Sequence, residues 1–331
     1  MLKFVLNRLV GMVLVLLFLT ATLFFLRQIT PGDPAKQLLG ANASVSALKE
    51  ARHALYLDRP IYVQYTHFLA GVTHGDLGTS TRTQRTVLSD LARFLPPSIV
   101  LASLALLVAV LLALLMGNLF GLGIRGSSVT NNLLISLSST PPFLLGLLAV
   151  IIFYAWLFWL PAGGQSSFFD APSGPTNAVL IDSLIHRRTD IALDAVKHLI
   201  LPVFVLAVGP AVAITRVFRS SLMSTMKTDY VRTARSKGMA ESRIVRRHAI
   251  RNSSGPALSM TGLQVGGMFA SLAVVEVIFA WPGVGSYVAQ SIPSGDFPGV
   301  TGVALVVGVT YVITNAVVDV LQALVDPRIR L

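Results

Sequence analysis

The chain has 331 residues, of which 53% are hydrophobic and only 12% are charged, and its formal net charge is +11. This composition excludes an ordinary soluble domain and indicates an integral membrane protein. The chain has no cysteine, which excludes disulfides, thiolate metal sites and cysteine catalysis.

Six apolar segments follow one another along the chain, near the length of about 20 residues that a helix needs to cross a bilayer core. The first is longer than the core of a signal peptide and lacks a clear cleavage site, so we interpret it as a retained span. Pro141, Pro142, Pro202 and Pro210 fall inside later segments, where we expect kinks in packed membrane helices. The predicted spans are 9–26, 98–122, 132–160, 198–222, 257–280 and 300–325.

The distribution of Lys and Arg predicts the side of each loop, because cytoplasmic loops are enriched in these residues. Residues 216–251 contain ten basic side chains, whereas the loop 281–299 contains none. We therefore predict that both termini are cytoplasmic, although Arg187, Arg188 and Lys197 in the third loop oppose the pattern. The other basic residues that support this topology are Lys3, Arg8, Arg125, Arg328 and Arg330.

The first loop is predicted to be an ordered extracytoplasmic insertion. Within it, residues 46–72 have apolar side chains at helical spacing and indicate two short helices, interrupted at Asp58-Arg59-Pro60. The predicted organisation is an N-terminal end with the first span (1–28), the insertion (29–97) and a core of five spans (98–331). The core carries a cytoplasmic loop at 223–256.

That cytoplasmic loop contains the sequence DYVRTARSKGMAESRIVRRHAIRNSSGP. Asp229 and Gly238 bracket a short predicted helix, because an acid suits the positive end of a helix and glycine accepts the left-handed closing conformation. Tyr230, Val231 and Ala234 share one face of it. A second helix is predicted at 241–251. Its arginines at 243, 247 and 251 lie four residues apart and so form one stripe.

Like charges at this spacing repel one another, so the stripe favours an anionic neighbour. Three neighbours are consistent with the charge. If the neighbours are acidic lipid headgroups, the arginines only contact these headgroups and fix the topology of the chain. Nucleic acid is not predicted, because no recognition motif or aromatic platform accompanies the charge. A soluble cytoplasmic partner is the third, and the small side chains of the first helix (Thr233, Ala234 and Ser236) favour it by allowing close approach.

The same loop resembles a known motif. DYVRTARSKGM followed by RHAIRN is similar to the cytoplasmic coupling motif of ABC-importer permeases, in the dipeptide/oligopeptide/nickel branch. The resemblance covers essentially the whole chain, and the long insertion is typical of the first permease of such systems. Other matching segments, in chain order, are TPGDPAKQLLG, LDRPIYVQY, GDLGTS, EVIFAWPGVGSYV, SGDFPGVTGV and VDPRIRL.

The resemblance implies an all-α integral membrane fold of six transmembrane helices, like that of type I ABC-importer permeases, in the bacterial cytoplasmic (inner) membrane. It also implies four kinds of partner: a second homologous permease, two ATP-binding subunits, an extracytoplasmic substrate-binding protein and the lipid bilayer. ATP and Mg belong to the ATP-binding subunits. The chain itself has no GxxxxGK[ST] phosphate loop, and we predict no catalysis or cofactor in it.

The resemblance further implies that the first helix of the loop seats in an ATPase subunit. Arg232, Thr233 and Ala234 then occupy the Glu-Ala-Ala positions of the wider motif, and Gly238 occupies its glycine. The chain departs from the motif at the first two of these positions, and Gly255-Pro256 replaces its closing Leu-Pro. The full set of predicted coupling residues is Asp229, Tyr230, Arg232, Thr233, Ala234, Arg235 and Gly238.

Three polar residues within predicted spans are candidates for the translocation path, because such groups usually face a bundle interior or a cavity. They are Glu276, Asn315 and Asp319, and each could instead satisfy a neighbouring helix. A second set of candidate residues flanks the fifth loop. These residues either form turns with an aromatic anchor at the membrane interface or contact the binding protein. This set is Trp281, Pro282, Gly283 and Asp296.

The six histidines show no metal-binding spacing, and we predict no metal site. Because the family includes nickel importers, His67, His74 and Asp76 are an alternative set for handling nickel. Ser-His-Asp catalysis is not predicted, since no Gly-x-Ser-x-Gly occurs and no serine is placed with a histidine inside a span.

The predicted function is that of a permease subunit in an ATP-driven importer of di- or oligopeptides, in which the fourth and fifth spans re-pack when ATP binds to the partners. A nickel or other small-solute importer of the same family is the alternative. From another class, a self-sufficient secondary transporter is possible in principle, but the chain lacks the inverted repeats expected of one. An intramembrane enzyme has no catalytic constellation to support it.

Overall fold

The computed structural model describes residues 2–29, 34–40, 43–121, 132, 135–172 and 174–325, and this part of the chain is almost entirely helical. Its only β feature among the described residues is an isolated antiparallel bridge between Thr79 and Thr86. The chain packs as two compact units. Unit 1 contains the described parts of 94–286 and 311–331, and unit 2 contains those of 2–93 together with 287–310.

Five described helices are long and apolar enough to cross a membrane. The first two apolar stretches are Val10–Ile29 in α1 (Leu2–Ile29) and Val87–Gly117 in α5 (Val87–Gly121). The next two are the whole helices α9 (Thr189–Thr225) and α12 (Ile250–Ile278). The last is Phe297–Gln322 in α14 (Phe297–Val325). These stretches coincide with five of the six predicted spans. The predicted third span is present as a shorter apolar helix, Pro142–Trp156.

This shorter helix consists of α7 (Pro142–Ala149) and the π-helical segment η1 (Val150–Trp156). We expected Pro141 and Pro142 to kink this span. Instead, they lie at the start of the helix. Proline fits the first turn of a helix because the N–H that it lacks would have no helical partner there. Pro202 and Pro210 do lie inside a helix, α9, as predicted.

The loop predicted to be cytoplasmic (223–256) differs from the prediction at its C-terminal end. We expected one helix at 241–251 and a new span from residue 257. Instead α11 (Glu241–Ile244), the π-helical segment η2 (Val245–Ala249) and α12 follow one another without a break. The N–H of Ile250 bonds to the carbonyl of Val245, five residues earlier, and so carries the helix onward. Pro256 lies inside α12, which a packed membrane helix tolerates. Arg125, Arg328 and Arg330, used for the topology, lie outside the described residues.

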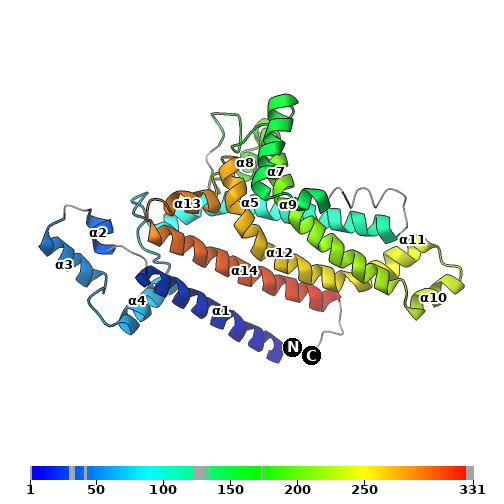
Figure 1. The fold of residues 1–331 in the computed structure, drawn as a ribbon, viewed down its shortest axis with the longest axis horizontal. Coiled ribbons are helices and arrows are strands. Elements are labelled where there is room, and N and C mark those ends of the chain that lie inside the picture. The colour runs from blue at the N-terminus through cyan, green and yellow to red at the C-terminus, as the bar shows by residue number, and fades with distance from the viewer. Residues whose placement is uncertain are drawn as a thin grey trace. The chain divides into compact units, whose positions relative to one another are not determined.

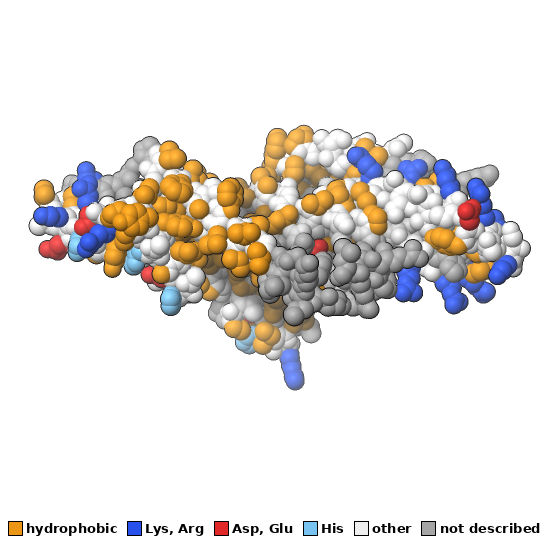
Figure 2. All heavy atoms as spheres, turned by 90° about the horizontal axis from the view of Figure 1, so that it is seen from below, with side chains coloured by type: hydrophobic (Ala, Val, Ile, Leu, Met, Phe, Trp, Pro, Cys, Tyr) orange, Lys and Arg blue, Asp and Glu red, His pale blue; other side chains and the backbone are white. Residues whose placement is uncertain are grey.

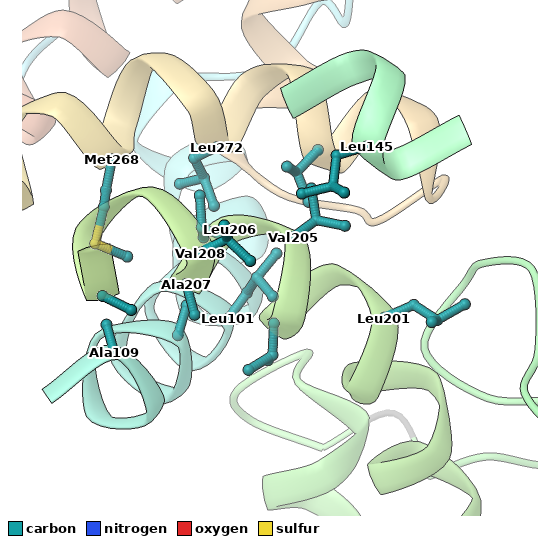
Figure 3. Close-up of a cluster of buried hydrophobic side chains, with 14 of the residues drawn as sticks. Leu101, Ala109, Leu145, Leu201, Val205, Leu206, Ala207, Val208, Met268 and Leu272 are labelled. Atoms are coloured by element: carbon teal, nitrogen blue, oxygen red, sulfur yellow. The ribbon is translucent and has the colours of Figure 1, made fainter. Parts of the chain in front are cut away.

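Unit 1 is built around α9, of whose apolar window 78% is buried. Helix α9 runs along α12 (Figure 1). Figure 3 shows how the core side chains interdigitate: Leu101 and Ala109 come from α5, Leu206 from α9 and Leu272 from α12. Small residues permit this close packing. A Cβ at Gly117, for example, would lie 2.2 Å from the Phe218 ring.

Unit 2 contains the described part of the predicted insertion up to Arg93. The predicted pair of short helices is present as α3 (Val45–Ala54) and α4 (Ile61–Thr73), after the short α2 (Pro34–Leu39). Figure 1 shows α4 beside the C-terminal end of α1. There the ring of Phe24 contacts those of Tyr65 and Phe68, with centroids 5.4 and 5.9 Å apart. The predicted domain boundaries follow the membrane rather than packing, and they stay a prediction.

Candidate coupling site

The short helix predicted between Asp229 and Gly238 is α10 (Asp229–Ser236). Thr228 before it is extended, and Asp229 occupies its first turn. Its end is set by Gly238, whose φ of +74° is readily adopted only by glycine. The N–H of Gly238 bonds to the carbonyl of Arg235 at 3.0 Å, and that of Met239 bonds to the carbonyl of Ala234 at 3.3 Å. The predicted start and end of this helix are therefore confirmed.

Helix α10 is anchored on one side and open on the other. The Val231 side chain is fully buried, whereas those of Arg232, Thr233 and Arg235 are exposed and Ala234 is half-buried. Asp229 is also exposed, and its carboxylate lies 3.4 Å from the Arg232 guanidinium. Figure 2 shows Lys and Arg side chains gathered over the end of the molecule where α10 and α11 lie. The exposed face thus offers charges and small side chains on a fixed helix.

Two hydrogen bonds fasten this loop to the membrane helices. The Asn252 amide of α12 donates to the Tyr230 hydroxyl of α10 at 2.7 Å. Ser253 of α12 donates to the Thr225 hydroxyl, at the end of α9, at 3.1 Å, and both residues are buried. Helices α9, α10 and α12 are therefore joined at one end by side chains as well as by the chain itself.

A bidentate ion pair closes the turn at Gly238. The Arg235 Nε donates to one oxygen of Glu241 at 2.5 Å, and Nη2 donates to the other at 3.2 Å. This hydrogen bonding lowers the pKa of the Glu241 carboxyl and raises the pKa of Arg235. No partner for Arg235 within the chain was predicted. An acid six residues later across a glycine turn is the signal that could have revealed one.

The predicted arginine stripe is only partly regular. Arg243, Arg247 and Arg251 are all exposed, and so is Arg246. However, η2 lies between the first and last of them, and a π-turn holds more residues than an α-turn. The arginines therefore form a broad cationic surface instead of one straight row.

Glu276 is fully buried near the C-terminal end of α12. One carboxylate oxygen accepts a hydrogen bond from Ser98 of α5 at 2.5 Å, and the other accepts one from the Ser286 N–H at 3.0 Å. Ser286 lies at the N-terminal end of α13 (Val284–Ser291), where a negative charge is favourable. Ser98 also accepts from the Val284 N–H at 2.8 Å. These contacts join three helices within unit 1.

The residues of the fifth loop differ in exposure. Trp281 is 2% exposed, and its indole N–H donates to the Pro97 carbonyl at 3.1 Å. Gly283 packs so closely that a Cβ would lie 2.1 Å from the Glu276 Oε1. Pro282 is exposed. In unit 2, Asp296 is fully buried and accepts from the Ser80 hydroxyl at 2.7 Å.

Asn315 and Asp319 lie one turn apart on α14 and are half-buried. The Asn315 amide donates to the Tyr311 carbonyl at 2.9 Å. Small residues of α12 face this helix, since a Cβ on Gly262 would lie 3.2 Å from the Asn315 Oδ1. Nearby, α9, α12 and α14 line an open groove of about 510 Å³ whose wall includes Ser259 and Gln322.

One serine and one histidine do lie together, although the serine is in a loop and not inside a span. The Ser167 hydroxyl, in the loop before α8 (Val179–Ile185), is 3.0 Å from the Nε2 of His198 on α9. The histidine Nδ1 bonds to the Gly163 carbonyl at 2.9 Å, while Asp194 lies 3.6 Å from Nε2. The carboxylate therefore does not orient Nδ1 as a catalytic triad requires.

The same loop ties α9 to the end of α12. The N–H of Gly164 donates to the Phe279 carbonyl at 2.8 Å. A Cβ at Gly163 would lie 2.4 Å from that carbonyl oxygen, so the close approach requires glycine. Together with His198, these contacts hold the second end of the α9–α12 pair.

No group of three or more His, Asp or Glu suited to a metal ion occurs among the described residues. His67 lies stacked on Tyr56 with ring centroids 4.0 Å apart, and the Nδ1 of His74 is 2.8 Å from the Ala70 carbonyl. The structure therefore does not bring His67, His74 and Asp76 together as a metal site.

Comparison with known proteins gives two family matches. Residues 109–331 match the binding-protein-dependent transport system inner membrane component, and residues 1–102 match the N-terminal family of such membrane components. The chain is 38% identical to the probable D,D-dipeptide transport system permease protein DdpB of Escherichia coli, covering 96% of this chain and 95% of the relative. It is 36% identical to the di/tripeptide transport system permease protein DppB of Pseudomonas aeruginosa, covering 100% and 99%.

A third relative is the glutathione transport system permease protein GsiC of Salmonella typhi, which is 32% identical and matches 100% of this chain and 99% of its own length. These matches extend from end to end, so they include the insertion as well as the spans. They confirm the expected nearly all-helical type I permease fold. The chain belongs to the family of binding-protein-dependent transport system inner membrane components, as an ABC-importer permease of the dipeptide/oligopeptide/nickel branch.

Proposed function

We propose that this chain is the first permease of a heterodimeric, ATP-driven importer of di- or oligopeptides in the bacterial inner membrane, with both termini cytoplasmic. The peptide substrate is supported by the relatives, which are named for D,D-dipeptides, di/tripeptides and glutathione. None of these three names mentions nickel, and no cluster of three or more metal-ligating side chains occurs among the described residues.

The observation that carries the coupling role is the construction of α10. Its Val231 face is buried and its far side is exposed, while its end is fixed by Gly238 and by the Arg235–Glu241 ion pair. We assign Asp229, Arg232, Thr233, Ala234 and Arg235 to the surface that a partner ATPase contacts. ATP and Mg belong to that partner, and no step of hydrolysis falls to this chain.

The contacts favour a rigid lever over the re-packing of the fourth and fifth spans that the sequence suggested. Helices α9 and α12 are tied at one end by Thr225 and Ser253, along their length by the core, and at the other end by Gly164 and Phe279. Closure of the ATPases would then move α9, α10 and α12 as one body. The motion opens the path toward the binding protein.

Among the path candidates, Asn315 and Asp319 are favoured, because they are half-buried on α14 near an open groove. Glu276 supports the frame instead, since Ser98 and Ser286 occupy its carboxylate. On the outer side, Pro282 is the exposed member of the set assigned to the binding protein, and Trp281, Gly283 and Asp296 shape the loops from within.

The test is uptake of a labelled dipeptide by proteoliposomes. Proteoliposomes that contain the complete importer should accumulate dipeptide only when ATP is supplied on the side of the ATPase subunits. Proteoliposomes that contain this chain alone should accumulate none. Uptake by the chain alone down an ion gradient would contradict the proposal and favour a secondary transporter. Uptake of nickel but not dipeptide by the complete importer would keep the coupling role and replace the substrate.

A further inference from the structure

Unit 2 contains a cavity of about 450 Å³ that none of the assigned roles uses. Its wall is formed by the C-terminal end of α1, by α4, by the loop at 76–81 and by the first turns of α14. The volume falls within the range of about 300–1,000 Å³ that is typical of small-molecule sites. It is therefore large enough for a ligand of a few residues or a lipid headgroup.

The wall carries two opposite charges, Arg27 and Asp76. No hydrogen bond or ion pair joins the Arg27 guanidinium to another described residue. One oxygen of Asp76 accepts from the Gly78 N–H at 3.0 Å, and no ion pair to this carboxylate occurs among the described residues. A half-buried guanidinium carries five donors, so its charge and its geometry suit a carboxylate or a phosphate.

The rest of the wall suits the uncharged part of a ligand. Phe24, Phe68 and Phe297 supply apolar surface, and Gln64 and Thr301 supply neutral polar groups. His67 is the only histidine on the described wall, so with Asp76 it gives at most two metal ligands and does not make a metal site. Charges of both signs on an apolar wall match a molecule that itself carries both charges.

We propose that this cavity binds a small zwitterion, with its carboxylate or phosphate on Arg27 and its primary ammonium on Asp76. Two sources supply this chemistry. A peptide is the first, and that source rests on the proposed function. The second is the headgroup of phosphatidylethanolamine, because Arg27 lies near the end of the membrane-spanning stretch Val10–Ile29, where such headgroups are found. The site itself is argued from the wall alone.

The experiment uses the complete importer in nanodiscs of phosphatidylcholine, whose quaternary ammonium has no N–H to donate. Dialanine binding is measured by calorimetry without ATP or binding protein. Retention of added phosphatidylethanolamine is measured by native mass spectrometry. We expect saturable binding of one of the two, which identifies the source. Each of Arg27→Gln and Asp76→Asn should weaken that binding by about tenfold or more, the scale of one charge-assisted hydrogen bond.

The matched control is Arg59→Gln, which removes an exposed cation of the same unit outside the cavity and should leave binding unchanged. Arg27→Lys keeps the charge, so it should retain most of the binding even if Arg27→Gln assembles poorly. Binding of neither ligand, or binding that both charge-removing variants leave intact, would overturn the proposal. A complex that still imports dipeptide with ATP but binds neither ligand here would refute only the site, leaving the proposed function in place.

Discussion

The Ser98 hydroxyl and the Glu276 carboxylate meet at 2.5 Å between α5 and α12, 178 positions apart in the chain. Both side chains are buried, and the second carboxylate oxygen is held by the N-terminal end of α13. A charged group inside a membrane bundle persists only where such donors satisfy it. The pair therefore joins α5 to the C-terminal end of α12 and to the first turn of α13.

Replacing Glu276 by Gln should lower the free energy of unfolding by about 1–3 kcal/mol. The carboxylate accepts hydrogen bonds from Ser98 and from the Ser286 N–H, whereas the amide of Gln points its own N–H group at one of these two donors. The measurement is the midpoint of thermal unfolding of the purified chain in detergent. Glu50→Gln is the matched control, since Glu50 is exposed and no hydrogen bond or ion pair joins its side chain to another described residue. Equal midpoints for the two variants would mean that the buried carboxylate has no structural role.

Gly283→Ala should destabilise the same cluster by about 1–3 kcal/mol, the usual range for overpacking. The added Cβ would lie 2.1 Å from the Glu276 Oε1 and 2.3 Å from the Ser98 hydroxyl. At Gly209, by contrast, a Cβ meets nothing within 4 Å, so Gly209→Ala should be neutral or slightly stabilising. Unfolding curves of the two variants, recorded side by side, test the difference, and an unchanged Gly283→Ala would disprove the close contact.

Gly238→Val should uncouple ATP hydrolysis from transport in the complete importer. A β-branched residue is strained at a φ of +74°, so the end of α10 must change its path. Asn tolerates this region, and Gly238→Asn should retain most of the activity. The readouts are dipeptide uptake and ATPase rate in proteoliposomes. Uptake at the unaltered rate by the Val variant would exclude a role for the helix end in coupling.

The Arg235–Glu241 pair predicts a pH dependence of the loop. The pKa of Glu241 is lowered in the folded protein, so the pair stabilises the turn above the ordinary glutamate pKa of about 4.3. That contribution is lost as the pH falls through the lowered value. Because the chain has no cysteine, a single spin label can be placed at Ser236. Its mobility should rise only in acid, whereas in Glu241→Gln it should be high at every pH. A label equally mobile in both proteins at neutral pH would contradict the pairing.

The rigid lever predicts an unchanged distance between α9 and α12 during the cycle. Met223 on α9 and Val277 on α12 are exposed at opposite ends of the helix pair, so the distance between labels there reports any sliding of one helix along the other. Pulsed electron paramagnetic resonance should give the same distance distribution with and without ATP on the partner subunits. A shift of several ångströms would favour re-packing of the two helices instead.

Much of the fold could be predicted from periodicity and composition. The long spans and the break at Asp58-Arg59-Pro60 are local patterns, and so is the helix between Asp229 and Gly238. The contacts of Glu276 and His198 could not be predicted, because their partners come from segments far away in the chain. The assignment of the coupling residues to an ATPase surface stays a prediction.

The continuity of α11 through α12 was missed for a different reason. Ser-Ser-Gly-Pro before residue 257 is a typical loop sequence in soluble proteins, and propensity alone indicates a break there. Within a bilayer, unsatisfied backbone groups are so unfavourable that the chain stays helical through Pro256. The environment, which propensity scales do not contain, decided this segment.

The burial of α9 has a consequence for biosynthesis. Helix α5 precedes it from the ribosome, but α12, which completes its cover, is made later. A nascent chain that ends after Thr225 therefore presents to lipid the small and polar side chains of α9 that the finished bundle encloses. Such truncated products should therefore be recognised and degraded by membrane proteases.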